Sequence, residues 1–151
     1  MDSLGIILGG LGLALMAGLS GVGSSIGLVT AGNAAVGALK KRPEIFGPAL
    51  VLSALPASQG LYGFVAYIIY QPFLTSNITV FNGGVMLAAG IAFGIVALAS
   101  AIKMGQLLAS GINALGSGSD VFAPTLILAA FPELYAILGL VVAILLKSLI
   151  V

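Results

Sequence analysis

Four long apolar stretches fill almost the whole chain, and they constrain its fold more than any other feature. They run from about Leu4 to Ala38, Phe46 to Tyr70, Gly83 to Leu115 and Val121 to Leu146. A membrane-spanning helix needs roughly 20 mostly apolar residues, so each stretch can cross a bilayer. Strands are not expected, because the stretches lack the alternation of a membrane barrel. The sequence predicts an all-α, multi-pass cell-membrane protein with residues 1–151 in a single domain.

The shortage of charge supports this class and excludes others. Only 6% of the residues are charged, against about 25% in an ordinary soluble protein. No basic stripe is present to neutralise phosphates, which argues against nucleic-acid binding. The sequence contains no Cys and no His, and this excludes disulfides, thiol chemistry and the usual zinc sites. It also contains no P-loop and no activated nucleophile, so we expect no catalytic activity and no cofactor.

Short connections join the four stretches and predict antiparallel neighbours. The first connection, residues 40–44, contains Lys40, Lys41 and Arg42. Positively charged loops stay cytoplasmic. The connections at residues 40–44 and 116–120 are therefore predicted to face the cytoplasm, and both termini to lie on the other side.

Three further charged residues are assigned to ordinary structural roles. Asp120 precedes the fourth stretch and is predicted to cap its first turn. Lys103 is expected to extend from the third stretch towards water. Lys147 is predicted to anchor the outer end of the fourth stretch at the membrane interface.

The second half of the chain repeats the first at an offset of 76 residues. The matching positions include two prolines and run without gaps; they pair Phe46, Pro48, Leu50, Leu52, Ala54 and Pro56 with Phe122, Pro124, Leu126, Leu128, Ala130 and Pro132. Residues 1–75 and 76–151 are therefore predicted to form two helical hairpins of the same orientation. A proline inside a helix frees the carbonyl four residues earlier, so we expect both Pro56 and Pro132 to shape their helices.

Small residues form a stripe on each of the two longest stretches. The stripes comprise Ala14, Gly18, Gly21 and Ser25 on the first, and Gly90, Gly94, Ala97, Ala101 and Gly105 on the third. Small residues at spacings of three and four let helix backbones approach closely in lipid. The stripes predict either a tight four-helix bundle or the inner wall of a ring of subunits.

One carboxylate, Glu133, lies near the middle of the fourth stretch. A charge at that depth is costly and indicates a functional site; the alternative is a protonated Glu133 that only joins helices. In the second stretch, the residues Leu55, Ser58, Gln59 and Tyr62 are spaced to share one helix face. The aligned position of Glu133 in the first hairpin is Ala57, so one hairpin supplies the charge and the other supplies neutral oxygens.

These residue types favour a cation site. Hard cations such as Na⁺ prefer several oxygen ligands, whereas a proton needs a single acceptor. Glu133 together with Ser58, Gln59 and nearby backbone oxygens therefore favours Na⁺. Tyr62 is expected to donate to Glu133 and hold its rotamer.

At these residues the chain resembles the proteolipid (K or c) subunit of the membrane rotor ring of prokaryotic V/A-type rotary ATPases. Residues 55–64, LPASQGLYGF, are similar to the helix-two motif of that family, and residues 133–139, ELYAILG, to its helix-four motif. The resemblance implies identical subunits in a ring that turns in lipid against a stator membrane subunit. It also implies that the loops at 40–44 and 116–120 contact the central stalk, and that other subunits process ATP.

The resemblance further implies a ligand set. In sodium-binding members it would comprise the Leu55 carbonyl, the Ser58 hydroxyl, the Gln59 amide and the Glu133 carboxylate, with Tyr62 locking the carboxylate. A helix-three glutamine completes that set, but Met104 stands at its position here. Gln106 lies about 200° further round the helix, so it is not expected to replace the missing ligand. The transported ion is left open between Na⁺ and H⁺.

Two other functions remain as alternatives. A small ion-coupled exporter would also use a carboxylate within the membrane, facing a substrate cavity usually lined by aromatic residues; this chain has no Trp. A structural or channel-forming four-span protein would leave the polar face of Ser58, Gln59 and Tyr62 unexplained.

Overall fold

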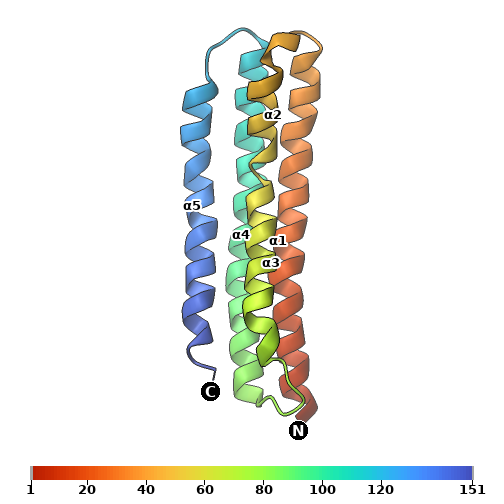
Figure 1. Cartoon of the computed structure of the whole chain (residues 1–151), viewed down its shortest axis with the longest axis vertical. Coiled ribbons are helices and arrows are strands. Elements are labelled where there is room, and N and C mark those ends of the chain that lie inside the picture. Colours follow the sequence, from red (N-terminus) through yellow and green to blue (C-terminus); the bar gives the residue numbers. More distant parts are fainter. Residues whose placement is uncertain (1, 151) are drawn as a thin grey trace.

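The computed structural model describes residues 2–150 as an elongated bundle of helices (Figure 1). The elements are α1 (Asp2–Leu39), α2 (Phe46–Ala54), α3 (Ala57–Tyr70), α4 (Val80–Gly116) and α5 (Phe122–Lys147). Short 3-10 turns at Pro43–Ile45 and Gln71–Phe73 flank the α2–α3 segment. Four segments are long and apolar enough to cross a membrane, as predicted.

The first and third spans, which are helices α1 and α4, are longer than the second and fourth spans. Helix α1 has 38 residues and α4 has 37, so each extends about 55 Å, beyond the roughly 30 Å apolar core of a bilayer. Both ends of the chain lie at one end of the bundle, and the connections α1–α2 and α4–α5 lie together at the other (Figure 1). Two hairpins of the same orientation are therefore packed side by side.

Glycines bring α1 and α4 into backbone contact along their length. A Cβ on Gly105 would lie 2.5 Å from the Cα of Gly27, and Cβ atoms on Gly83 and Gly90 would overlap the backbone of α1 at Gly5 and Gly12. The stripe predicted on α4, which runs from Gly90 to Gly105, is buried as expected.

The stripe predicted on α1 does not take part in this contact. Gly18 and Gly21 are exposed, and a Cβ on either would meet no atom within 4 Å. A different face of α1, which includes Gly5, Gly12, Gly23 and Gly27, packs on α4 instead. Of the two alternatives predicted for the stripes, the tight bundle therefore holds within the chain for the α4 stripe and not for the α1 stripe.

The second span is broken at Pro56, although the sequence suggested one continuous stretch. Helix α2 ends at Ala54 and α3 begins at Ala57. The Leu55 amide donates to the Leu52 carbonyl at 3.4 Å, so the carbonyl that the proline frees gains a partner through a tighter turn. The Pro56 ring packs against α1, where a Cβ on Gly27 would lie 2.8 Å from the Pro56 Cβ. Pro132, the repeat equivalent, lies inside the continuous helix α5.

The predicted cap at Asp120 is wrong. Helix α5 begins at Phe122, with Val121 in the capping position and no side-chain cap hydrogen bond. Asp120 is one residue too early to cap the helix, because the first helical bond runs from the Thr125 amide to the Val121 carbonyl at 3.0 Å. A side-chain cap does occur on α4, where the Thr79 hydroxyl accepts from the Asn82 amide at 3.1 Å.

Gly63 lies at a close contact between α3 and α1. A Cβ at this position would overlap the Ser20 hydroxyl and lie 2.6 Å from the Met16 carbonyl oxygen. We expect Gly63→Ala to destabilise the protein by about 1–3 kcal/mol through overpacking, although Ala alone favours a helix. The measurement is the thermal midpoint of helicity in detergent. Gly47→Ala is the control, because a Cβ there meets nothing within 4 Å; equal midpoints for the two variants would contradict the prediction.

Candidate ion-binding site

Glu133 lies half-buried between two apolar clusters of the bundle. The cluster nearer the α1–α2 and α4–α5 connections includes Leu52 and Met104, and the other includes Ala66 and Phe93. The carboxylate therefore lies where neither water nor lipid is expected to provide its hydrogen bonds. Its partners come from α3.

Three of the side chains predicted to share a face of the second span converge on this carboxylate. The Ser58 hydroxyl donates to Glu133 Oε2 at 2.7 Å, and Gln59 Nε2 donates to the same oxygen at 2.9 Å. The Tyr62 hydroxyl donates to Oε1. All three donors lie on α3 and the acceptor on α5, so the site joins the two hairpins of the repeat.

Leu55 contributes its backbone to the same region. Its carbonyl accepts from the Ser58 amide at 3.2 Å and lies 3.0 Å from the Ser58 hydroxyl, whose single proton is shared between this carbonyl and the nearer Glu133 Oε2. Leu55, Ser58, Met104 and Glu133 line a cavity of about 320 Å³, which Leu126, Ala129 and Ala130 complete. Leu55, Ser58 and Glu133 therefore lie around one space.

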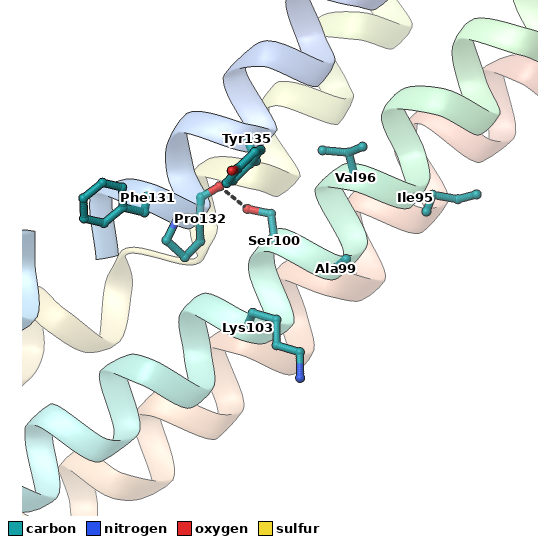
Figure 2. Close-up of a pocket in the computed structure, with 8 residues that line it drawn as sticks. All are labelled: Ile95, Val96, Ala99, Ser100, Lys103, Phe131, Pro132 and Tyr135. Carbon is teal, nitrogen blue, oxygen red and sulfur yellow. Dashed lines mark hydrogen bonds between the residues drawn. The ribbon is translucent and has the colours of Figure 1, made fainter. Parts of the chain in front are cut away.

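Ser100 on α4 belongs to the site, and the sequence reasoning missed it. Its hydroxyl donates to the Pro132 carbonyl at 2.5 Å, which Figure 2 shows as a dashed line. It also accepts from Gln59 Nε2 at 3.4 Å. The available signal was its spacing, because Ser100 lies four residues before Met104 and so shares its helix face.

These contacts fix the orientation of the fully buried Gln59 amide. Nε2 has three neighbours that can accept, namely Glu133 Oε2, Ser100 Oγ and Met104 Sδ at 3.7 Å. The amide oxygen lies instead beside the Ser58 hydroxyl, at 3.2 Å. Gln59 therefore directs its nitrogen towards α4 and its oxygen towards Ser58.

The third-span positions lie as predicted. Met104 is only 1% exposed and lines the cavity beside Glu133. Gln106 is on the exposed face of α4, where it accepts a hydrogen bond from the Lys103 ammonium at 3.3 Å. The cavity therefore has a thioether where the resemblance leads one to expect an amide.

No basic side chain of the described chain neutralises Glu133. The ion pair found within residues 2–150 joins Arg42 to Glu44 at 2.7 Å, at the connection end of the bundle. Neutral donors therefore satisfy the Glu133 carboxylate without cancelling its charge. Such an arrangement can exchange a small cation, because no basic side chain of the described residues has to leave the carboxylate first.

The comparisons with known proteins all point to one family. The sequence profile of the family described as the C subunit of ATP synthase matches residues 11–70 and again residues 87–146, two segments separated by the same 76 residues as the repeat. The double match agrees with two tandem hairpins.

Individual relatives agree with this match. The chain is 39% identical over 142 residues to the A-type ATP synthase subunit K of Methanocaldococcus jannaschii, an alignment covering 93% of this chain and 62% of that protein. It is 37% identical over 142 residues to the V-type sodium ATPase subunit K of Enterococcus hirae, covering 94% and 91%. It is 23% identical over 129 residues to the 16 kDa proteolipid of the V-type proton ATPase of Rattus norvegicus, covering 85% and 83%. The chain thus spans less than two thirds of the Methanocaldococcus protein.

Tyr62→Phe should make Glu133 more reactive. The change removes one of three donors and keeps the ring, and a hydrogen bond to a charged group contributes about 1.5–3 kcal/mol. We expect labelling of Glu133 by a hydrophobic carbodiimide to accelerate about tenfold or more, measured by mass spectrometry of the intact protein. Tyr67→Phe on the same helix is the control, because the Tyr67 ring stacks on Phe64 and not on the site. Equal labelling rates in the two variants would show that Tyr62 does not restrain the carboxylate.

Proposed function

The chain belongs to the family of ATP synthase C subunits, and on this basis we propose that it is an ion-translocating rotor-ring subunit of a V/A-type ATPase. Identical copies would form a ring in lipid, and Glu133 of each copy would bind and release one cation as the ring turns against a stator membrane subunit. Other subunits would hydrolyse or make ATP. The family match favours this function over the small exporter considered from the sequence.

The observation that carries the proposal is a mid-span carboxylate with three neutral donors and no basic partner in the described chain. An uncompensated charge at that depth is costly. A bound cation cancels it, so only a loaded subunit can cross the lipid-facing part of a rotation. Because the uncompensated charge is costly, an empty Glu133 is more stable when it binds a new ion or lies beside a positive charge on the stator.

Na⁺ is the first candidate for the ion. The Leu55 carbonyl, the Ser58 hydroxyl, the Gln59 amide oxygen and the Glu133 carboxylate supply four oxygens, and hard cations prefer such ligands. Leu55, Ser58 and Glu133 border one cavity. The contacts of Gln59 Nε2 with Ser100 and Met104 leave the amide oxygen on the side of Ser58.

H⁺ is the second candidate, and Met104 is the observation that favours it. A thioether is a soft, weak acceptor. It occupies the wall of the cavity where a fifth oxygen would complete a Na⁺ shell. A proton needs no such shell, because Glu133 alone can hold it while Ser58 and Gln59 remain its neighbours.

Release of the ion requires Glu133 to leave its donors. The side chain would swing away from Ser58, Gln59 and Tyr62, all of which lie on α3. We propose that a stator arginine, as the family resemblance implies, stabilises the carboxylate in that swung position. Tyr62 acts as the latch, because it alone holds Oε1 while the other two donors share Oε2.

The connection end of the bundle is the proposed contact with the central stalk. The Arg42 guanidinium donates to the Leu115 carbonyl at 3.1 Å and pairs with Glu44, so the first connection is tied to the end of α4. Arg42, Gly118, Ser119 and Asp120 help line a cavity of about 390 Å³ between the two connections. The basic cluster at residues 40–42 favours a cytoplasmic location for this end.

Glu133→Gln should abolish ion transport while leaving assembly largely intact. The amide keeps the size of the side chain but cannot bind and release a cation through a change of charge. The measurement is ATP-driven ion uptake by the reconstituted ATPase, with ring assembly checked by electron microscopy. Ser53→Ala is the control and should retain transport, because the Ser53 hydroxyl donates to the Leu50 carbonyl of its own helix and lies outside both the site and the connections. Loss of the ring in Glu133→Gln would instead indicate that the carboxylate only joins helices.

Met104→Gln should raise the affinity for Na⁺. The added amide oxygen faces the cavity, and we expect Na⁺ to protect Glu133 from carbodiimide at about tenfold lower concentration, which corresponds to about 1.4 kcal/mol. Met104→Leu is the control, because it removes the sulfur without adding an oxygen. In the unmodified protein, protection by Na⁺ at fixed pH would support Na⁺ transport, and protection by raised pH alone would support H⁺. An unchanged Na⁺ dependence in Met104→Gln would show that position 104 does not reach the ion.

A further inference from the structure

Tyr70 forms a hydrogen bond between α3 and α5 that lies far from the ion site. It is the last residue of α3 and is fully buried, and its hydroxyl donates to the Ala143 carbonyl on α5. Tyr70 follows Tyr62 by eight residues and Ala143 follows Glu133 by ten, so this bond lies about 12–15 Å along the helices from the site. The two helices are therefore linked at two depths, and the function proposed above uses only the link at Glu133.

Helix α5 depends on such links because little of it is buried. In its most apolar part, 22% of the residues are buried within the chain, against 50% for α4. The buried residues of α5 are all small, namely Thr125, Ala129, Ala136 and Ala143. Large side chains therefore do not fix α5 to the bundle, and interhelical hydrogen bonds are the specific attachments that remain.

Two of these attachments do not involve the Glu133 side chain. Ser100 on α4 donates to the Pro132 carbonyl at 2.5 Å, and Tyr70 on α3 donates to the Ala143 carbonyl. A helical carbonyl oxygen has two lone pairs, so it can accept from a hydroxyl as well as from the amide one turn later. Both attachments are therefore independent of the charge and the rotamer of Glu133.

A cation–π contact supports the Tyr70 bond at the same end of the bundle. The Lys147 ammonium lies 5.2 Å from the centre of the Phe73 ring. Lys147 comes one helical turn after Ala143 on α5, and Phe73 follows Tyr70 directly after the end of α3. The ends of the second and fourth spans, which lie at the end of the bundle that holds both chain ends (Figure 1), are therefore held together by two contacts of different kinds.

The internal repeat groups Tyr70 with the residues of the ion site. Framework positions are shared by both hairpins, as Pro56 and Pro132 are. The α3 residues that bond to α5 are not shared: the equivalents of Ser58, Gln59, Tyr62 and Tyr70 are Leu134, Tyr135, Leu138 and Leu146. Tyr70 therefore differs between the two halves as Tyr62 does, with a hydroxyl in the first hairpin and a leucine in the second. This pattern is expected if the Tyr70 hydroxyl serves the carboxylate that only the second hairpin carries.

We propose that Tyr70 is a positioning residue for the ion site, because its bond to the Ala143 carbonyl holds the α5 backbone at a fixed distance from α3. The inference rests on the function proposed above. When Glu133 leaves its donors, the α3–α5 link at its own depth is lost and the link at Ala143 remains. Release is then a movement of the Glu133 side chain, while the helix stays in place. The site is thereby pre-organised for the next cation, which strengthens binding because less ordering is needed when the cation arrives.

Tyr70→Phe should loosen the carboxylate from a distance. The variant keeps the buried ring and removes one interhelical hydrogen bond, and such bonds in membranes correspond to factors of about three to ten. In the assembled ATPase at fixed pH and low Na⁺, we expect carbodiimide to label Glu133 faster by about that factor. Tyr67→Phe is the control, because the Tyr67 ring stacks on Phe64. Equal labelling rates in Tyr70→Phe and the unmodified protein would overturn the inference.

A double-mutant cycle with Tyr62→Phe separates positioning from a general loss of stability. Changes at distant residues without a shared partner normally have additive free energies, so their effects on the labelling rate multiply. Without the Tyr62 hydroxyl, Glu133 restrains α5 less, and the position of the helix depends more on Tyr70. We expect the double variant to be labelled at least about threefold faster than the product of the two single effects. Effects that simply multiply would show that Tyr70 only stabilises the fold.

A disulfide between α4 and α5 should take over the role of the Tyr70 hydroxyl. A Cβ on Gly139 would lie 3.4 Å from the Val96 Cβ, close to the Cβ separation of about 3.8 Å in disulfides, and the chain has no Cys of its own. In Tyr70→Phe/Val96→Cys/Gly139→Cys, oxidation should return the labelling rate of Glu133 to that of the same Cys pair with Tyr70 intact. Reduction should raise the rate again. A rate that stays raised after oxidation would contradict a role of Tyr70 in holding α5.

The outcomes also separate this inference from the proposed function. If Glu133→Gln retains ion transport, or if neither Na⁺ nor pH alters the labelling of Glu133 in the unmodified protein, the rotor function fails. If those tests succeed and Tyr70→Phe is labelled at the unmodified rate, only the positioning role fails. If the Cys pair does not oxidise, the cycle with Tyr62→Phe decides alone.

Discussion

A carboxylate in the middle of a membrane span must be supplied with hydrogen-bond donors by the protein, because lipid offers none. Glu133 obtains them from Ser58, Gln59 and Tyr62 on a different hairpin. This is possible only if α3 and α5 lie at a fixed depth and distance. The close contact of α3 with α1 at Gly63, and of α1 with α4 at Gly27, sets that distance.

The duplicated hairpin separates two tasks that one hairpin would have to combine. The first hairpin provides neutral donors and a helix broken at Pro56, and the second provides the charge on the continuous helix α5. Helix α4 connects the two, since Ser100 contacts both Gln59 and the Pro132 carbonyl. The repeat therefore preserves the framework while its side chains have diverged in chemistry.

Much of this arrangement is predictable from the sequence, because apolar length and helical periodicity determine it directly. The four spans and the polar face of the second span needed only residue spacing. Ser100 was missed because a lone serine in an apolar helix usually bonds to its own backbone. The break at Pro56 and the continuity at Pro132 depend on packing against neighbouring helices, which no single helix reveals. The face of α1 that packs on α4 is not the one that carries the predicted stripe, and spacing alone does not distinguish them because both faces of that helix carry small residues.

The alanine at position 57 has a consequence for energy conversion. In the proposed ring, circumference grows with every helix, whereas transferable charge grows only with every fourth helix. Such a rotor has a low ion-to-ATP ratio, because each turn moves fewer ions than a ring of the same size with an acid on every hairpin. Because the work available from ATP is then divided among fewer ions, each ion can be driven against a steeper gradient. A single missing carboxylate thereby raises the ion gradient that ATP hydrolysis can sustain, and it raises equally the gradient that ATP synthesis would require.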